Sequence, residues 1–138
     1  MSTPSLLLDT CVIIFAHQGV VLREEANHLL GRASEASALF VSPMSAWEIG
    51  KLVATRKLRL PFDPLDFFNR FIATAGVSIC TVSPEILVRS SMLPDFAHRD
   101  PMDCILVATA RIKDYTIVTS DRKILDYGRR GHVKTLSC

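Results

Sequence analysis

The chain is 138 residues long, which suits one domain with its own hydrophobic core. Its composition, 49% hydrophobic and 22% charged residues, is that of a globular protein and excludes a disordered one. The formal net charge is only +2, so a nucleic-acid partner cannot be argued from the total charge and would need a local basic patch. We therefore predict a single globular domain over residues 1–138.

The N-terminal residues and the cysteines indicate the compartment. Residues 1–4 lack the basic and long apolar regions of a secretory signal. No stretch approaches the roughly 18 consecutive apolar residues that a membrane span needs. The cysteines are far apart, show no metal-binding spacing and mostly lie in apolar runs, as free core thiols do. They are Cys11, Cys80, Cys104 and Cys138. We expect a cytoplasmic protein with structural thiols and no membrane association.

Short apolar runs predict the strands. The first, over 5–9, is apolar on both faces, as a central parallel strand is. Asp9 stands at its carboxyl end, where open α/β sheets place their ligand sites. The other runs that we assign to strands are 37–41, 77–82, 115–119 and a last one near 133–135.

Capping residues and apolar periodicity predict the helices between the strands. Asp100 followed by Pro101 is typical of an N-cap with proline at the first helical position, which places Asp103 in the first turn. The other helices are expected over 23–35, from 42 onward, from 63 to a stop at Gly76, over 83–92, and as a short turn at 124–125. Strands that alternate with helices imply a three-layer α/β fold, a mostly parallel sheet of four or five strands flanked by helices.

The helix that begins at Ser42 contains two further signals. Ser45 and Glu48 have the S-x-x-E spacing of a capping box. Trp47 lies among the apolar positions of this helix, and we assign it to the core in preference to a base-stacking platform.

Four acidic side chains take comparable places in this fold. Asp9 and Asp121 come just past strands, and Glu48 and Asp103 lie in first helical turns. Carboxylates that meet in one cleft repel each other by roughly 3 kcal/mol per ionised pair at about 5 Å, with an effective dielectric constant near 20, so a cation must neutralise them. Ligand sets of oxygen alone favour Mg²⁺ or Mn²⁺ over Zn²⁺. Such a site suits the cleavage of phosphodiesters.

Each of these acids also has a purely structural explanation. Asp9 and Asp121 can cap the helices that follow them. Glu48 can close the capping box, and Asp103 can complement the helix macrodipole. The four explanations together are less economical than one shared metal site. Asp100 differs, because capping explains it well and metal ligation is the alternative.

Basic residues suggest contacts with phosphate. His98 and Arg99 can position a phosphate or bind Asp100 locally. One basic cluster lies near the C-terminus and contains Arg122, Lys123, Arg129, Arg130, His132 and Lys134. A second contains Arg56, Lys57 and Arg59. Such clusters are usually solvated surface; beside an acidic metal centre a track for an RNA backbone is the alternative, and the sequence leaves both open. The residues that we assign to RNA are Arg122, Lys123, Arg129 and Arg130.

Four motifs, in this order, resemble the signatures of PIN-domain ribonucleases and, more closely, of VapC-type toxins of toxin–antitoxin pairs. They lie at 7–10, 41–51, 98–103 and 119–121, so the resemblance covers nearly the whole chain. It implies a PIN-like fold, with Asp9, Glu48, Asp103 and Asp121 as metal-binding acids and Ser120, Asp100 and Thr10 as supporting residues. The chain departs from the family at Cys104, where many relatives carry a basic residue, and at Arg56, which replaces a common glycine.

The resemblance implies an endoribonuclease that depends on Mg²⁺ or Mn²⁺ and acts as the toxin of a toxin–antitoxin pair. Its implied partners are an RNA substrate, a cognate small antitoxin and a second copy of the chain in a homodimer. One alternative is a PIN-like nuclease that acts on DNA or structured RNA in processing or repair. The other is a toxin–antitoxin complex that works mainly as an operator DNA-binding module. The acids do not determine which RNA is cut, because substrate choice depends on loop shape and charge layout.

Overall fold

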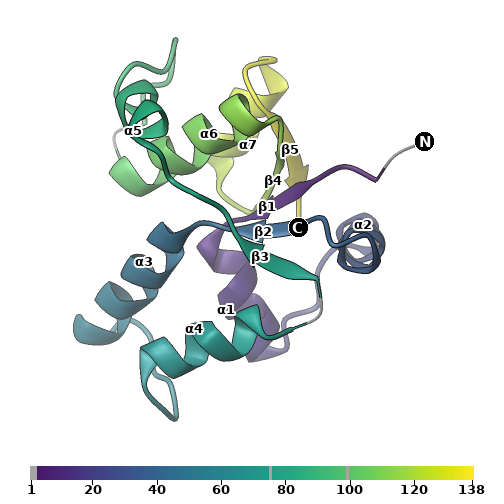
Figure 1. Cartoon of the computed structure of the whole chain (residues 1–138), viewed down its shortest axis with the longest axis vertical. Helices are drawn as coiled ribbons and strands as arrows, with labels where there is room; N and C mark the ends of the chain where they lie inside the picture. Colours follow the sequence, from purple (N-terminus) through teal and green to yellow (C-terminus); the bar gives the residue numbers. More distant parts are fainter. Residues whose placement is uncertain (1–2, 75, 99) are drawn as a thin grey trace.

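The computed structural model describes residues 3–74, 76–98 and 100–138 (Figure 1). In this part of the chain five strands form one sheet, in the order β3-β2-β1-β4-β5, and every neighbouring pair is parallel. The strands are β1 (Leu6–Leu8), β2 (Leu39–Val41), β3 (Val77–Ile79), β4 (Thr116–Thr119) and β5 (Lys134–Ser137). The predicted parallel sheet is therefore confirmed.

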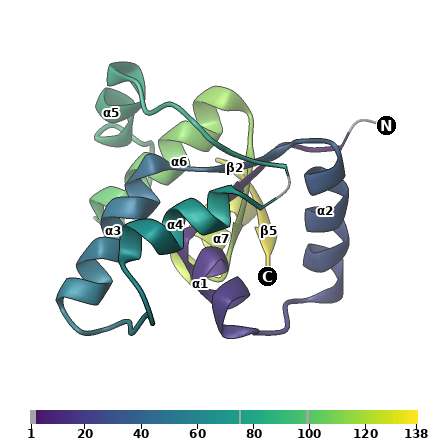
Figure 2. The ribbon, with the colours of Figure 1, turned by 60° about the horizontal axis from the view of Figure 1, so that its bottom comes forward.

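Helices cover both faces of this sheet. They are α1 (Thr10–Gln18), α2 (Glu24–Glu35), α3 (Pro43–Ala54), α4 (Pro64–Ile72), α5 (Pro84–Ser90), α6 (Pro101–Lys113) and α7 (Arg122–Arg129). Figure 1 shows α1, α3 and α4 on one side of the strands and α5, α6 and α7 on the other. Figure 2 shows α2 standing at the right-hand side of the molecule. This arrangement is the three-layer α/β fold that the sequence predicted.

The side chains of β1 divide the core in two. Leu6 and Leu8 point to a cluster that includes Ile13 of α1, Ile49 of α3 and the phenylalanines of α4. Leu7 points the other way, to a cluster built mostly from α6 and α7. Successive side chains of a strand point to opposite faces, and all three leucines are at most 2% exposed. Burial of each contributes about 1.5–3 kcal/mol, so β1 is apolar throughout because both of its faces are covered.

The N-terminal caps fix where the helices start. An Asp100 carboxylate oxygen accepts a hydrogen bond from the Met102 backbone N–H at 2.9 Å, with Pro101 at the first helical position, as predicted. Asp121 caps α7 in the same way, since it accepts from the N–H groups of Lys123 and Ile124. Such side-chain bonds satisfy donors that have no partner within the helix.

The predicted capping box in α3 is wrong. The cap is Ser42, whose Oγ accepts from the Met44 N–H at 3.1 Å. Ser45 lies inside the helix, is 3% exposed, and accepts a hydrogen bond from the Thr10 hydroxyl at 2.9 Å. Because the helix begins one turn earlier than the box required, Glu48 lies in the second turn and not in the first.

Four further predictions differ from the structure. Trp47 is 55% exposed and not in the core, with the Lys51 ammonium 5.0 Å from its ring centroid. The helix α7 has eight residues where a single turn was expected. The strand β3 ends at Ile79, short of the predicted 82, and α4 ends at Ile72, several residues before Gly76. The strand β3 lies at the edge of the sheet and is as short as its neighbours β2 and β1, which also have three residues each.

The four cysteines are free, as predicted; Cys80 is buried and the others are half-buried. Among the described residues, no helix is both long enough and apolar enough to cross a membrane.

Candidate active site

The candidate site lies where the strand order of the sheet reverses. From β1 the chain proceeds outward to β2 and β3 on one side, whereas β4 and β5 lie on the other. Asp9 follows β1, and Asp121 follows the neighbouring β4, so both acids stand at the carboxyl edge at this switch point. Open α/β sheets bind their ligands at such a place.

A cleft of about 300 Å³ opens at this edge. Its lining contains every metal-binding and supporting residue that the sequence predicted, namely Asp9, Thr10, Glu48, Asp100, Asp103, Ser120 and Asp121. These residues come from positions up to 112 apart in the sequence, so only the fold brings them together.

Asp9 is held on both of its carboxylate oxygens. One accepts from the Thr10 backbone N–H at 2.8 Å, and the other from the Thr119 hydroxyl at 2.7 Å. The side chain is 9% exposed, and this burial raises its pKa; the charges of Glu48 and Asp121 raise it further, while the two hydrogen bonds lower it. Asp9 therefore caps α1 and also presents a buried carboxylate to the cleft.

Thr119 is a site residue that we did not predict. Its hydroxyl donates to Asp9 and accepts from the Asp121 backbone N–H at 2.9 Å, so one buried side chain links the two acids. The only sequence signal was a threonine at the end of the strand before Ser120 and Asp121.

Asp103 lies at the third position of α6, as predicted, and its side chain is 13% exposed. Burial raises the pKa of this carboxyl to about 7, and the charge of Asp9 raises it next. Asp100 and Asp121 add smaller increases, whereas a hydrogen bond from His98 lowers the pKa. An acid with this pKa is only partly ionised at neutral pH, because burial and the neighbouring carboxylates disfavour its charged form.

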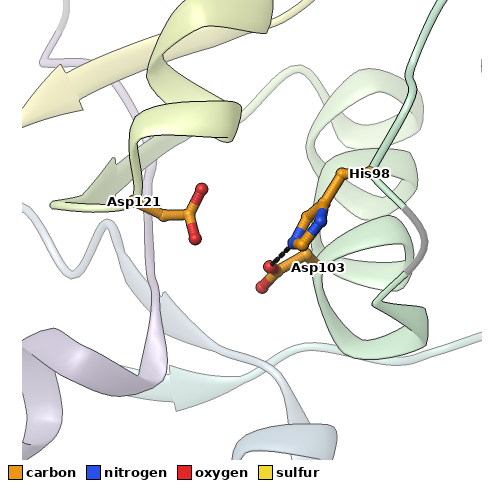
Figure 3. A group of neighbouring side chains, drawn as sticks. All are labelled: His98, Asp103 and Asp121. Atoms are coloured by element: carbon orange, nitrogen blue, oxygen red, sulfur yellow. Dashed lines mark hydrogen bonds and ion pairs between the residues drawn. The ribbon is translucent and has the colours of Figure 1, made fainter.

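His98 forms a side-chain hydrogen bond with the acid Asp103. Its Nε2 lies 2.5 Å from Asp103 Oδ2, and ligand atoms of His98, Asp103 and Asp121 all lie within 4.8 Å of one another (Figure 3). In Figure 3 the Asp121 carboxylate, at the start of α7, points toward the other two side chains. The alternative that His98 binds Asp100 is therefore wrong, and a histidine joins a set that we expected to be acidic alone. Arg99, its companion in the prediction, lies outside the described residues.

The ring of His98 is fixed from two sides. The Phe96 ring meets it edge-on with centroids 5.8 Å apart, and Lys123 Nζ lies 3.3 Å from its Nδ1. The loop that carries both aromatic rings is anchored to α7, because the Tyr127 hydroxyl donates to the Pro94 carbonyl at 2.5 Å. With Lys123 donating to Nδ1, Nε2 carries the proton and donates to Asp103.

The remaining predicted residues lie around this centre. Glu48 reaches the cleft from α3, and its charge acts on Asp9, but it is outside the tight group of three. Thr10 ties α1 to α3 through Ser45. Ser120 is exposed, and its hydroxyl lies 3.6 Å from the Cys11 sulfur.

A second cavity, of about 390 Å³, borders the site. His98 and Lys123 line it together with Phe96 and the acid Asp126. All the residues that the sequence assigned to RNA also lie here, namely Arg122, Lys123, Arg129 and Arg130. The predicted basic patch is therefore a real concave surface beside the acids.

The reversed strand order and the acidic cleft are those of a PIN-like α/β protein. Residues 6–130 match the family model of the PIN domain, and the chain belongs to this family. That the whole chain, residues 1–138, is one domain stays a prediction.

None of the curated protein sequences matches this chain. Among solved structures, VapBC2 from Rickettsia felis, bound to a DNA fragment from its promoter, has a TM-score of 0.71 at 13% identity and covers 96% of this chain and 98% of that chain. A toxin–antitoxin complex from Klebsiella pneumoniae has a TM-score of 0.62 at 22% identity, with 96% of each chain covered. DNA-bound VapBC from Salmonella typhimurium has a TM-score of 0.65 at 15% identity, with 97% and 98% covered. At these identities the likeness is one of fold.

Proposed function

We propose that this protein is a metal-dependent endoribonuclease and the toxin of a toxin–antitoxin pair. Membership of the PIN domain family supports a nuclease. The observation that carries the proposal is the meeting of Asp9, Glu48, Asp103 and Asp121 in one cleft beside a basic cavity.

The donor chemistry fits a divalent metal ion. Burial raises the pKa of the Asp9 and Asp103 carboxyls, that of Asp103 to about 7, and a bound cation would favour their ionised forms. The donors are carboxylate oxygens with one imidazole at their edge, a set that suits Mg²⁺ or Mn²⁺. We assign the ion to Asp9, Glu48, Asp103 and Asp121, directly or through water.

Such an ion, when bound, supplies an activated water and polarises the scissile phosphate. The side chains of this protein supply the positioning. Thr119 and the Thr10 N–H fix both oxygens of Asp9, and His98 fixes one oxygen of Asp103. Because these bonds hold the carboxylates in fixed positions, little ordering is needed at the moment of reaction.

The basic cavity supplies the substrate contacts. Arg122, Lys123, Arg129 and Arg130 form its positive wall, and phosphate groups are the natural partners of such a surface. The RNA enters the acidic cleft from this side, past His98 and Lys123.

The expected partners follow from the fold and from its neighbours. One solved neighbour is described as a toxin–antitoxin complex and two are described as VapBC proteins, which supports a small antitoxin as partner. We place this pair in the cytoplasm. The antitoxin would block the cleft with a basic side chain in place of the metal charge. Arginine suits that role because its planar fork pairs with carboxylates. We also expect the toxin to form a homodimer.

A second candidate function is binding to operator DNA. Two of the neighbours are described as DNA-bound complexes, and a toxin–antitoxin pair of this protein would bind its own promoter in the same manner. The two functions are compatible, because the DNA would contact the complex and the RNA would contact the acidic cleft.

The test is a cleavage assay on single-stranded RNA and on single-stranded DNA of the same sequence. We expect cleavage of the RNA in Mg²⁺ or Mn²⁺, none in EDTA, and recovery when the metal is restored. Complete cleavage in metal-free buffer would rule the mechanism out, and cleavage of DNA alone would favour a processing or repair nuclease. Co-expression with the adjacent small gene tests the antitoxin, since sedimentation as a lone monomer would contradict that part of the proposal.

A further inference from the structure

A large groove lies at the edge of the sheet opposite to the acidic cleft. Its volume is about 940 Å³, and it opens between the C-terminal ends of α6 and α7 and the starts of β4 and β5. Because parallel strands all start at the same edge, the strand β4 separates this groove from Asp121. Its charged and aromatic lining residues are Arg111, Asp114, Tyr115, Arg129, His132 and Lys134.

Specific contacts build the walls of the groove. Arg111 Nη1 donates to the His132 backbone carbonyl at 2.5 Å, so the end of α6 is tied to the turn before β5. The His132 ring stacks on Tyr127 with centroids 4.4 Å apart. Lys134 Nζ lies 2.9 Å from an Asp114 oxygen, and both side chains are mostly exposed. The groove is therefore a shaped surface that presents positive groups to solvent.

Arg129 connects this groove to the active site. It lines both the groove and the basic cavity beside His98, and its side chain is 70% exposed. The helix α7 begins at the acidic cleft, where Asp121 caps it, and ends at Arg129; eight residues at 1.5 Å each span about 12 Å. The acidic cleft, the basic cavity and the groove thus follow one another along α7, since His98 of the basic cavity bonds to Asp103 of the cleft and Arg129 lines both the basic cavity and the groove.

Positive charge is concentrated in the basic cavity and the groove. The two cavities are lined by six basic side chains, Arg111, Arg122, Lys123, Arg129, Arg130 and Lys134, and by two acids, Asp114 and Asp126. Their net charge of four exceeds the +2 of the whole chain, so the rest of the molecule is net negative. The potential therefore favours a long polyanion that lies along α7.

We propose that the groove is an exosite for the sugar–phosphate backbone of the RNA, which Arg111, Arg129 and Lys134 contact. The inference rests on the proposed function and adds a second contact region to it. RNA fits better than an acidic peptide, because the acidic cleft at the start of α7 has carboxylates that would repel peptide carboxylates, whereas a phosphodiester is what that cleft is proposed to cleave. At 3.4 Å per nucleotide, about 12 Å corresponds to roughly four nucleotides, so only an RNA longer than that reaches both regions.

The test compares two double variants that remove the same charge. Arg111→Gln with Lys134→Gln neutralises the groove, and the control, Arg23→Gln with Arg32→Gln, removes two exposed positive charges at α2, which belong to neither basic cluster. Binding of labelled RNA of about 4 and about 16 nucleotides is measured by fluorescence anisotropy in EDTA, so that no cleavage occurs. Thermal unfolding shows whether each variant is folded. If loss of the Arg111 bond to His132 disturbs the fold, Lys134→Gln is compared with Arg32→Gln in place of the double variants.

We expect the groove variant to bind the long RNA roughly tenfold more weakly, with a salt slope smaller by up to about 1.4, the value for two lost phosphate contacts on a single strand. Its affinity for the short RNA should stay unchanged, as should both affinities of the control variant. Equal effects of the two variants, or an equal loss on short RNA, would overturn the exosite. Loss of binding to a poly-glutamate peptide with unchanged RNA binding would also overturn it, in favour of an acidic protein partner. Cleavage of the short RNA in Mg²⁺ tests the proposed function alone, so the two failures are distinguishable.

Discussion

Asp100 and Asp103 lie in the same helix start but have different surroundings. Asp100 is exposed and bonds to the Met102 N–H, whereas Asp103 is half-buried and bonded to His98, and desolvation raises its pKa to about 7. A cap works through an acceptor oxygen, which asparagine retains. A metal ligand works through its negative charge, which asparagine lacks.

We therefore expect the unfolding free energy of Asp100→Asn to differ from that of the original protein by only a few tenths of a kcal/mol. Asp100→Ala should lose about 1 kcal/mol of unfolding free energy. Both should keep their cleavage activity at saturating metal. Asp103→Asn should stay folded and lose cleavage, because it removes the charge. Urea unfolding and cleavage rates of the three variants test this assignment. It is wrong if folded Asp100→Asn is as inactive as Asp103→Asn, since Asp100 would then belong to the metal site.

His98 should act on metal binding through Asp103. Its Nε2–H holds one oxygen of that carboxylate, and loss of such an outer contact typically costs about 10–100-fold in metal affinity or activity. We expect His98→Ala to raise the half-saturating Mg²⁺ concentration by about that factor, and His98→Gln, whose amide also donates, to recover part of the loss. The exposed His28 supplies the control, His28→Gln. If all three variants need the same Mg²⁺ concentration as the original, His98 has no positioning role.

At the level of helices and strands, the sequence was informative where the signal is local. The start of α6 follows from Asp100 and Pro101, and the burial of β1 follows from its unbroken apolar run. The capping-box prediction was wrong because Ser42, with Pro43 at the first helical position, caps the helix three residues before Ser45. The periodicity of α3 showed that Trp47 lies among its apolar positions but not which elements pack against that position. No described element covers the Trp47 ring fully.

Long-range contacts at the site were beyond the sequence. The bond between His98 and Asp103 depends on a loop whose path is set by Tyr127, 33 residues away from its acceptor Pro94. The family departure at Arg56, by contrast, has a local physical meaning. Arg56 has a φ of +61°, just past the C-cap of α3, where the left-handed backbone favours glycine.

The packing of α7 on β5 depends on a glycine. A Cβ at Gly128 would lie 2.4 Å from the Thr135 Oγ1 and 2.7 Å from its Cγ2, and a short β-branched side chain in a strand has little room to move. Gly31, inside α2, has nothing within 4 Å of the same position. The two glycines are thus a matched pair, in which alanine meets a neighbour at one site and open space at the other.

We expect Gly128→Ala to lose about 1–3 kcal/mol of unfolding free energy, because overpacking outweighs the better helix propensity of alanine. Gly31→Ala should gain about 0.4–1 kcal/mol from the reduced freedom of the unfolded chain. Urea unfolding of both variants measures the difference. Two stabilised variants would show that Thr135 moves aside freely and that α7 is not packed tightly on β5.

The free energy of unfolding of the whole molecule should depend on pH because of the acidic cleft. The folded pKa of Asp103 is about 7, above the ordinary 3.8, because of burial, and burial also raises the pKa of Asp9. Between about pH 4 and pH 7 the folded protein therefore binds more protons than the unfolded chain does. The contribution of these groups to stability is then largest at low pH, and it falls as the pH rises toward 7.

Without metal, we expect the unfolding free energy to decrease from pH 5 to pH 7 by at most about 3 kcal/mol through Asp103, at 1.36 kcal/mol per pH unit. Saturating Mg²⁺ should reverse this decrease, because an ion that binds only the folded, ionised cleft stabilises it by about 2.7 kcal/mol at a concentration 100 times its dissociation constant. The measurement is urea unfolding at both pH values, in EDTA and in Mg²⁺, for the original protein and for Asp103→Asn. The variant should show a flatter pH dependence and a smaller Mg²⁺ effect, since it has neither the titrating proton nor the ligand charge. Two results would contradict an acidic metal site at this edge of the sheet. One is a metal-free protein whose unfolding free energy rises from pH 5 to pH 7. The other is an Asp103→Asn variant that Mg²⁺ stabilises as much as it stabilises the original protein.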